Sequence, residues 1–279
     1  MQSNNPLRKY FRQPAIYIRL PSQGQWYEPN SLVMPANREL PVLPMTANDE
    51  ITSRTPDALF NGSAVIDIIA SCMPSIRNPW SVPSTDINAI LAGIRIASYG
   101  HSMTINSQCP NCGHDHEFEL DLRTVLEQLQ CPDYTKTLSV TGLTIGFRPL
   151  NYRQINENNL LQFEDQKLMQ LINQSDVDNQ EKLKVISDSF KKITRMTMRA
   201  IANCIKYIQG DGFQVEDSEQ ILEFLDNCDK SIFNLIRDHI AQLKQVSDFR
   251  PLSIQCTECT HQYQQEFVLD ISNFFETNS

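Results

Sequence analysis

The first 45 residues combine short apolar runs with frequent proline. Each proline fixes its own φ and restricts the residue before it, so these runs cannot continue as helices. We expect an extended, proline-rich N-terminal arm over residues 1–45. Its elements are a strand at 16–20, a second short strand at 25–27 and an extended segment at 40–44.

Two longer stretches, residues 46–100 and 151–248, carry apolar residues three and four positions apart, which is typical of amphipathic helices. In the first we expect a helix start at 46–50, a helix over 57–72, and another capped at 84–86. In the second we expect several helices, the longest over 181–209. Its buried stripe is predicted to hold Leu183, Ile186, Phe190, Ile193, Met196, Ala200, Ile201, Cys204, Ile205 and Ile208.

Strand-like alternation returns on both sides of two Cys-x-x-Cys motifs. The predicted flanking strands are 102–106 and 118–122 at the first motif, and 252–254 and 267–269 at the second. A further hairpin is predicted at 138–147, with Thr141 and Gly142 in its turn.

Together these patterns predict an α+β fold with a mainly helical body and a small antiparallel β zinc ribbon. The expected segments are the arm (1–45), a helical segment (46–100), the first half of the ribbon with a β-hairpin (101–150), a long helical insertion (151–248) and the second half of the ribbon (249–279).

The two cysteine motifs form a weak internal repeat, CPNCGH at 109–114 and CTECTH at 256–261. Tetrahedral zinc takes four soft ligands, and two such turns facing each other supply four thiolates. We therefore predict one structural Zn²⁺ ion bound by Cys109, Cys112, Cys256 and Cys259. An alternative is that a nearby histidine, His114, His116 or His261, replaces one cysteine.

Other site chemistries have weaker support. A redox Cys-x-x-Cys follows a strand and precedes a helix, and neither motif has that context. Catalytic zinc keeps an open coordination position, so a zinc hydrolase stays as an alternative to be tested. Cys72, Cys204 and Cys228 lie in helical stretches, where we expect small buried side chains. No motif of a nucleophile, phosphate loop or metalloprotease occurs, so we expect neither an enzyme nor a small-molecule substrate.

Charge narrows the classes of partner. The net charge is −9 and the pI is about 5.1, which argues against nucleic-acid binding as the main role. A local basic patch is still compatible with this charge, and its best candidates are Arg8, Lys9 and Arg12 near the start. No apolar run approaches the roughly 20 residues of a membrane helix, so we expect no membrane insertion. Residues 1–14 do not have the pattern of a secretory signal. Paired cysteines then favour synthesis in a reducing cytoplasm.

Several short motifs occur in an order that resembles a known family. They are LPSQGQWY at 20–27, Leu59 with Gly62, DINAILAGIR at 86–95, SYG at 98–100, the two cysteine pairs and Phe274-Phe275. In this order the chain is similar to the baseplate protein family of T4-like contractile-tailed bacteriophages, of the baseplate hub subunit type. The resemblance spans nearly the whole chain except residues 1–14.

The resemblance implies a virion structural protein in the tail baseplate, assembled in the bacterial host cytoplasm through contacts with other baseplate and tail proteins. It implies no catalytic residues. For such a role, residues 1–14 and 28–45 are the best candidates for arms that wrap a partner. The alternatives are a nucleic-acid-binding zinc-ribbon protein and a baseplate assembly factor that is absent from the mature virion.

Overall fold

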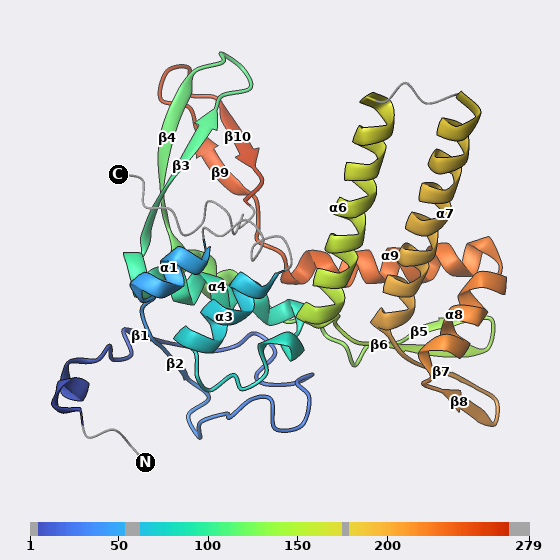
Figure 1. The fold of residues 1–279 in the computed structure, drawn as a ribbon, viewed down its shortest axis with the longest axis horizontal. Helices are drawn as coiled ribbons and strands as arrows, with labels where there is room; N and C mark the ends of the chain where they lie inside the picture. Colours follow the sequence, from blue (N-terminus) through green and yellow to red (C-terminus); the bar gives the residue numbers. More distant parts are fainter. Residues whose placement is uncertain (1–4, 54–61, 175–178, 268–279) are drawn as a thin grey trace. The chain divides into compact units, whose positions relative to one another are not determined.

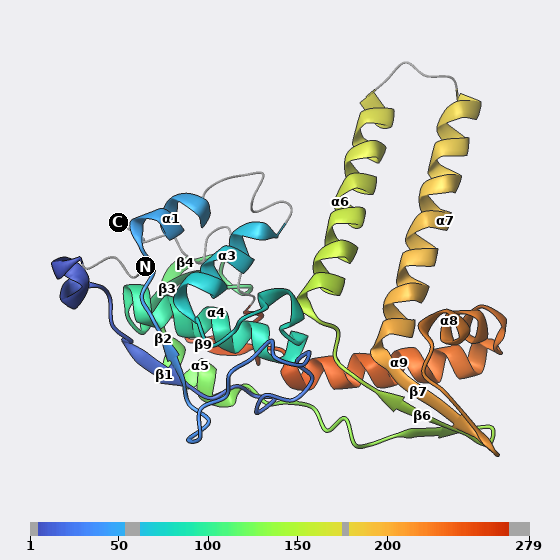
Figure 2. The same cartoon turned by 60° about the horizontal axis from the view of Figure 1, so that its bottom comes forward.

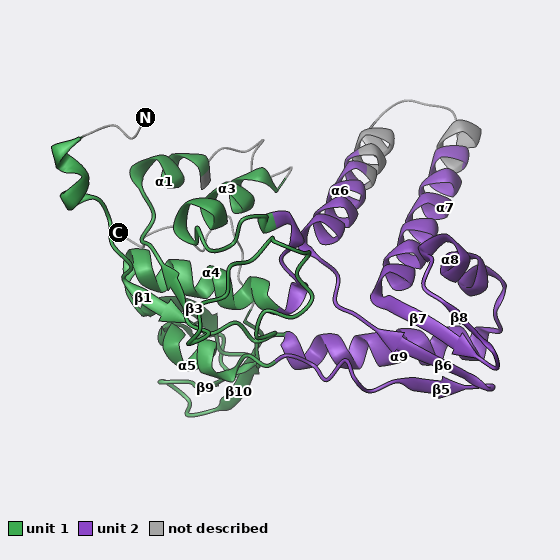
Figure 3. Ribbon diagram, turned by 90° about the horizontal axis from the view of Figure 1, so that it is seen from below, with its two compact units in different colours: residues 1–79, 86–130, 248–279 green, residues 80–85, 131–247 purple. Residues whose placement is uncertain are grey.

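A computed structural model describes residues 5–53, 62–174 and 179–267 of the chain (Figure 1). The fold mixes α-helices with small antiparallel sheets, as the sequence predicts. The chain divides into two compact units (Figure 3). Unit 1 holds residues 1–79, 86–130 and 248–279, and unit 2 holds residues 80–85 and 131–247.

Unit 1 contains four helices and three two-stranded antiparallel sheets among its described residues, besides a 3₁₀ turn at Pro6–Tyr10. The helices are α1 (Ala47–Ser53), α3 (Ser63–Cys72), α4 (Ser84–Tyr99, in unit 1 from Asp86) and α5 (Leu122–Gln128). The sheets are β1 (Ile16–Ile18) with β2 (Leu40–Val42), β3 (Ser102–Gln108) with β4 (Asp115–Asp121), and β9 (Leu252–Gln255) with β10 (Gln262–Gln265).

The core of unit 1 forms where β1 and β2 meet α3 and α4. Ile18 pairs with Leu40 across the two strands, and both side chains are buried with most of the apolar residues of α3 and α4. A Cβ atom at Gly93 would lie 3.1 Å from the Ile18 side chain, so glycine allows α4 to pack closely on β1. This contact fixes the position of α4, after which the chain continues into β3.

Polar contacts fix the ends of the core elements of unit 1. Thr46 and Asp49 cap α1 reciprocally, since each side chain accepts the other's backbone N–H, at 3.2 Å and 2.7 Å. Asp86, fully buried in the first turn of α4, accepts hydrogen bonds from the backbone and hydroxyl of Ser22 and from Tyr27 Oη. Charged and polar side chains thus join the N-terminal residues to the helices.

Arg95 on α4 is buried in a different way. Its guanidinium lies 4.6 Å from the centre of the Tyr99 ring, one helical turn away. Within the described part of the chain, neither its Nε nor its Nη1 has a hydrogen-bond partner. Burial accordingly lowers the pKa of Arg95. This cation therefore carries a desolvation cost, which its contact with the Tyr99 ring partly offsets.

Unit 2 packs helices against a four-stranded antiparallel sheet in the order β5-β6-β7-β8. Its core is centred on Ile145 and Phe147 of the sheet and buried residues of α7, α8 and α9. Figure 2 shows α6 and α7 as neighbouring helices. The elements are β5 (Leu138–Val140), β6 (Leu143–Phe147), α6 (Tyr152–Gln174), α7 (Asn179–Cys204), β7 (Ile205–Gly210), β8 (Phe213–Val215), α8 (Ser218–Asn227) and α9 (Lys230–Ser247).

Most predicted elements are present, but three were wrong in type or position. The long helix ends at Cys204 and its expected last turn is strand β7. The expected strand at 25–27 is part of a turn. The last strand lies at Gln262–Gln265, before the expected 267–269, of which 268–269 lie outside the described residues. A helix was also expected over 57–72. Helix α3 covers 63–72 of it and Gly62 precedes the helix, whereas 57–61 lie outside the described residues.

Residues 28–45 do not form a free arm in the structure. Val33 N donates to Ser75 O at 2.8 Å, and Leu32 forms a β-bridge with Ile76. Leu40 and Val42 are fully buried in unit 1. The extended conformation expected for 40–44 is present in β2. Its side chains, however, pack into the core of this chain and are not available to a partner.

Candidate metal centre

Two hairpins of unit 1 present loops of equal length. The last pair of β3 and β4 is Gln108 with Asp115, and the first pair of β9 and β10 is Gln255 with Gln262. Each hairpin therefore closes through six residues, 109–114 in one and 256–261 in the other. The weak sequence repeat corresponds to two copies of one local structure.

The two loops have the same backbone hydrogen bonds. Cys109 N donates to His114 O at 2.9 Å, and Cys256 N donates to His261 O at 2.9 Å. The residue four positions after the first cysteine has positive φ in both loops, 72° at Gly113 and 57° at Thr260. Glycine adopts this conformation without strain, whereas threonine does so at a cost. Thr260 keeps its positive φ because the loop 256–261 needs this conformation to close its turn.

The loops bring the four predicted cysteines together. All four sulfur atoms lie within 4.8 Å of one another. Cys109 Sγ is 3.6 Å from Cys259 Sγ, and Cys112 Sγ is 3.7 Å from Cys256 Sγ. Four sulfurs about 2.3 Å from a tetrahedral zinc ion are about 3.8 Å apart. The distances therefore fit a metal ion at the centre and are far too long for disulfides, of which these cysteines form none.

Burial follows the repeat as well. The first cysteine of each pair, Cys109 or Cys256, is almost fully buried, whereas Cys112 is exposed and Cys259 is partly exposed. The centre thus has an inner and an outer side, each with one sulfur from each hairpin.

Nearby amides and sulfur atoms shift the pKa values of the two outer cysteines, Cys112 and Cys259. The backbone amide of His261, with help from the Asn111 side chain, lowers the pKa of Cys259 to about 6. The matching amide of His114 lowers the pKa of Cys112, but the neighbouring sulfurs outweigh it and raise the value to about 12. Four thiolates so close together repel one another, and a bound dication removes that repulsion.

Side chains around the sulfurs join one hairpin to the other. Asn111 Nδ2 donates to Cys259 Sγ at 3.6 Å, and Gln265 Nε2 donates to Asn106 O at 3.4 Å. The hydroxyl of Tyr263 on β10 forms a hydrogen bond with the hydroxyl of Ser107 on β3. These polar contacts link the two hairpins beside the cysteine cluster.

The three histidines near the motifs lie outside the sulfur cluster, as judged over the described residues. His114 stacks on His116 with ring centres 6.1 Å apart, and His261 stacks on Tyr263 at 6.3 Å. His116 meets Tyr263 edge to face, so the four rings form one row across both hairpins. This arrangement favours four cysteine ligands over a set that includes histidine.

Sequence reasoning missed the supporting residues Asn111, Ser107 and Tyr263. A signal for Tyr263 was present, because it lies seven positions after Cys256 just as His116 lies seven after Cys109. Ser107 and Asn111 gave no such signal, since their partners are about 150 residues away. Of the other cysteines, Cys72 is fully buried as expected, whereas Cys204 and Cys228 are only partly buried.

The chain is thus a mixed α and β protein whose described part holds a candidate four-cysteine metal centre and no helix long and apolar enough to span a membrane. A family model described as T4 bacteriophage base plate protein matches residues 32–276. The chain therefore belongs to this family of phage baseplate proteins. No curated protein and no solved structure was found to match it.

Proposed function

We propose that this protein is a structural subunit of the tail baseplate of a contractile-tailed bacteriophage, of the hub type, and that one zinc ion stabilises its fold. The family match over residues 32–276 is the observation that carries the proposal. Its neighbours would be other baseplate and tail proteins. The protein would be made in the host cytoplasm and then reside in the virion.

The cysteine cluster supports a structural use of zinc. Four thiolates complete a tetrahedral shell, whereas catalytic zinc keeps one position for water or substrate. We infer that the hairpins β3–β4 and β9–β10 are the two halves of one zinc ribbon and that residues 131–247 are inserted between them. We also propose that the protein is not an enzyme.

The segment before β1 supports a role in contacts with neighbours. In the 3₁₀ turn Pro6–Tyr10 no residue is buried, and Leu7, Tyr10 and Phe11 are all more than half exposed. Arg12 anchors the end of this segment to unit 1, because its guanidinium donates to Pro44 O at 2.6 Å and to Ser71 O at 2.7 Å. An anchored segment with exposed aromatic side chains is suited to lie on another subunit.

Nucleic-acid binding through the ribbon is disfavoured. Residues 102–121 and 252–267 contain several Asp and Glu but no Lys or Arg. Phosphate groups would meet only negative charge there, and zinc bound by four thiolates would add more.

Purified phage particles provide the test. We expect mass spectrometry to find the chain at a fixed stoichiometry in tails, and cryo-electron microscopy to locate it in the baseplate hub. If the chain accumulates in infected cells but is missing from particles, it is an assembly factor and the structural proposal is refuted.

A further inference from the structure

Helix α7 of unit 2 has an apolar stripe that the unit covers over only part of its length. At its C-terminal end, Ile201 and Ala202 are buried in the core with α8 and α9. Toward the N-terminal end the side chain of Phe190 is 62% exposed and that of Ile193 is 36% exposed. The sequence predicted this stripe to be buried throughout, but Phe190 and Ile193 are exposed, and Ile186, Met196, Ala200 and Cys204 are only partly buried.

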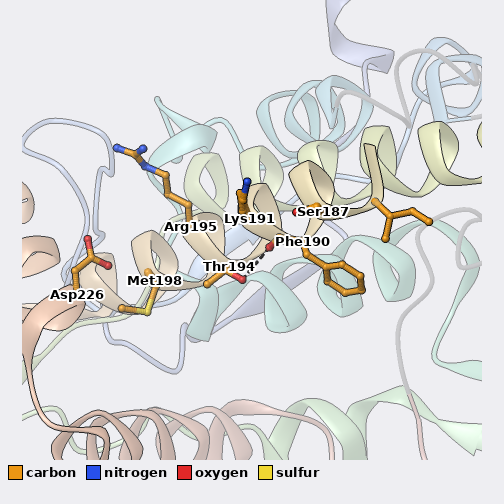
Figure 4. Close-up of a pocket in the computed structure, with 8 residues that line it drawn as sticks. Ser187, Phe190, Lys191, Thr194, Arg195, Met198 and Asp226 are labelled. Atoms are coloured by element: carbon orange, nitrogen blue, oxygen red, sulfur yellow. Dashed lines mark hydrogen bonds between the residues drawn. The ribbon is translucent and has the colours of Figure 1, made fainter. Parts of the chain in front are cut away.

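The exposed residues Phe190, Ile193 and Thr197 lie on one face of the helix, together with the partly buried Ile186. The four recur at spacings of three and four, so they form a continuous row. Beside the row is an open depression of about 820 Å³ (Figure 4). Its lining residues are Ile186, Ser187, Phe190, Lys191, Thr194, Arg195, Met198 and Asp226.

The surface of α7 is basic although the chain as a whole is acidic. Residues 184–204 contain Lys184, Lys191, Lys192, Arg195 and Arg199 but only one acid, Asp188. Lys191, Lys192 and Arg199 form ion pairs with Asp188, Glu164 and Glu219, so acids of the same unit partly compensate their charges. Arg195 forms no ion pair with any described residue and lines the depression.

We propose that residues 186–197 of α7 dock an amphipathic helix with an acidic flank, supplied by another protein of the assembly. Such a helix would place apolar side chains on Phe190 and Ile193 and a carboxylate near Arg195, the mode in which helices bind apolar grooves. It would continue along α7 the cover that α8 and α9 provide at the buried end. The proposal rests on the assembly role given above.

A second copy of this chain fits the same face poorly. A two-fold contact would bring Lys191 and Arg195 of one copy toward the same cations of the other. Nucleic acid also fits poorly, because an exposed Phe and Ile form the centre of the face.

The test is photo-crosslinking in cells infected with phage that carry p-benzoylphenylalanine in place of Phe190. The matched control places the same group at Phe213 of β8, another exposed aromatic position of unit 2 that lies outside the row and the depression. We expect a crosslink to one other phage protein at Phe190, with a yield at least about tenfold above the control. The captured peptide should have apolar residues three and four apart and a net negative charge.

Charge variants sharpen this test. Arg195→Glu should lower the crosslink yield at Phe190 by about tenfold, whereas Arg195→Lys should keep it within about twofold. Circular dichroism of each purified variant checks that α7 is intact. Equal yields at both positions, a crosslink to the chain itself or to nucleic acid, or a basic or non-helical captured peptide would overturn the proposal. The same samples separate the two claims, because absence from particles refutes the virion role while the crosslink in cells still judges this surface.

Discussion

Replacing Cys256 by serine removes one of the four sulfur atoms of the candidate zinc centre. Serine has nearly the same size but is a poor zinc ligand, so the variant isolates the metal from packing. Because Cys256 is almost fully buried on the inner side of the cluster, no water-exposed residue takes its place. We expect the variant to lose most of its bound zinc.

The size of the effect follows from what else holds the hairpins together. A link across a loop as long as that from Cys112 to Cys256 stabilises a fold by about 5 kcal/mol in the chain-entropy model. The hydrogen bonds of Ser107 with Tyr263 and of Gln265 with Asn106 contribute about 1 kcal/mol each. Loss of the metal should therefore remove a larger contribution to the link between β3–β4 and β9–β10 than these two hydrogen bonds supply together.

The assay is zinc stoichiometry by mass spectrometry, combined with hydrogen exchange. In Cys256→Ser, and in the wild type treated with a chelator, amides of 102–121 and 252–265 should exchange up to about 10³-fold faster. Amides of β6 and β7 should be unaffected, because unit 2 has its own core. Cys228→Ser is the matched control, since Cys228 lies outside the cluster. If Cys256→Ser keeps one zinc per chain, or if chelation leaves hydrogen exchange in both hairpins unchanged, the proposed zinc centre of four cysteines is refuted.

Three further predictions concern stability. Gly113→Ala should lower the free energy of unfolding by about 1 kcal/mol and Thr260→Gly should raise it slightly, because both positions have positive φ; opposite signs in urea titration would contradict this. Burial lowers the pKa of His239, so the unfolded chain binds its proton more readily and stability should fall as the pH drops below about 6.5. The variant His239→Phe should lose that part of the pH dependence, and an unchanged profile would refute its origin. Arg95→Met should raise the free energy of unfolding by about 1 kcal/mol, and the melting temperature with it, because it removes a buried cation whose Nε and Nη1 have no hydrogen-bond partner among the described residues; a lower melting temperature would contradict this.

The cysteine centre was predictable because its signal is local. Each Cys-x-x-Cys motif lies between alternating residues that predict strands, and two such turns supply four ligands. The contact between Tyr263 and Ser107 was not predictable, because nothing in either neighbourhood specifies which residues meet across two separate hairpins. Likewise, the burial of residues 40–42 depends on α3 and α4, and no local pattern distinguishes it from an arm that binds a partner.

The error at the end of α7 has a specific physical cause. A bulge between Gly146 and Phe147 shifts the register against β7, so that Ile205 and Ile208 are both buried although they are three residues apart. In a regular strand residues three apart face opposite sides. The bulged strand therefore has the spacing of a helix, and it directly follows a real helix whose stripe it appears to extend.

The two cysteine pairs lie in hairpins that are far apart in the sequence, and this separation sets an order of events during synthesis. Ribosomes add about 5–20 residues per second, and the larger segment of unit 2, residues 131–247, lies between Cys112 and Cys256. The first pair is therefore made roughly 7–30 seconds before the second. During that interval unit 2 has time to fold, and the early thiols are open to oxidation or to capture of the wrong metal. The second pair thus completes the protein only after the intervening unit has been made.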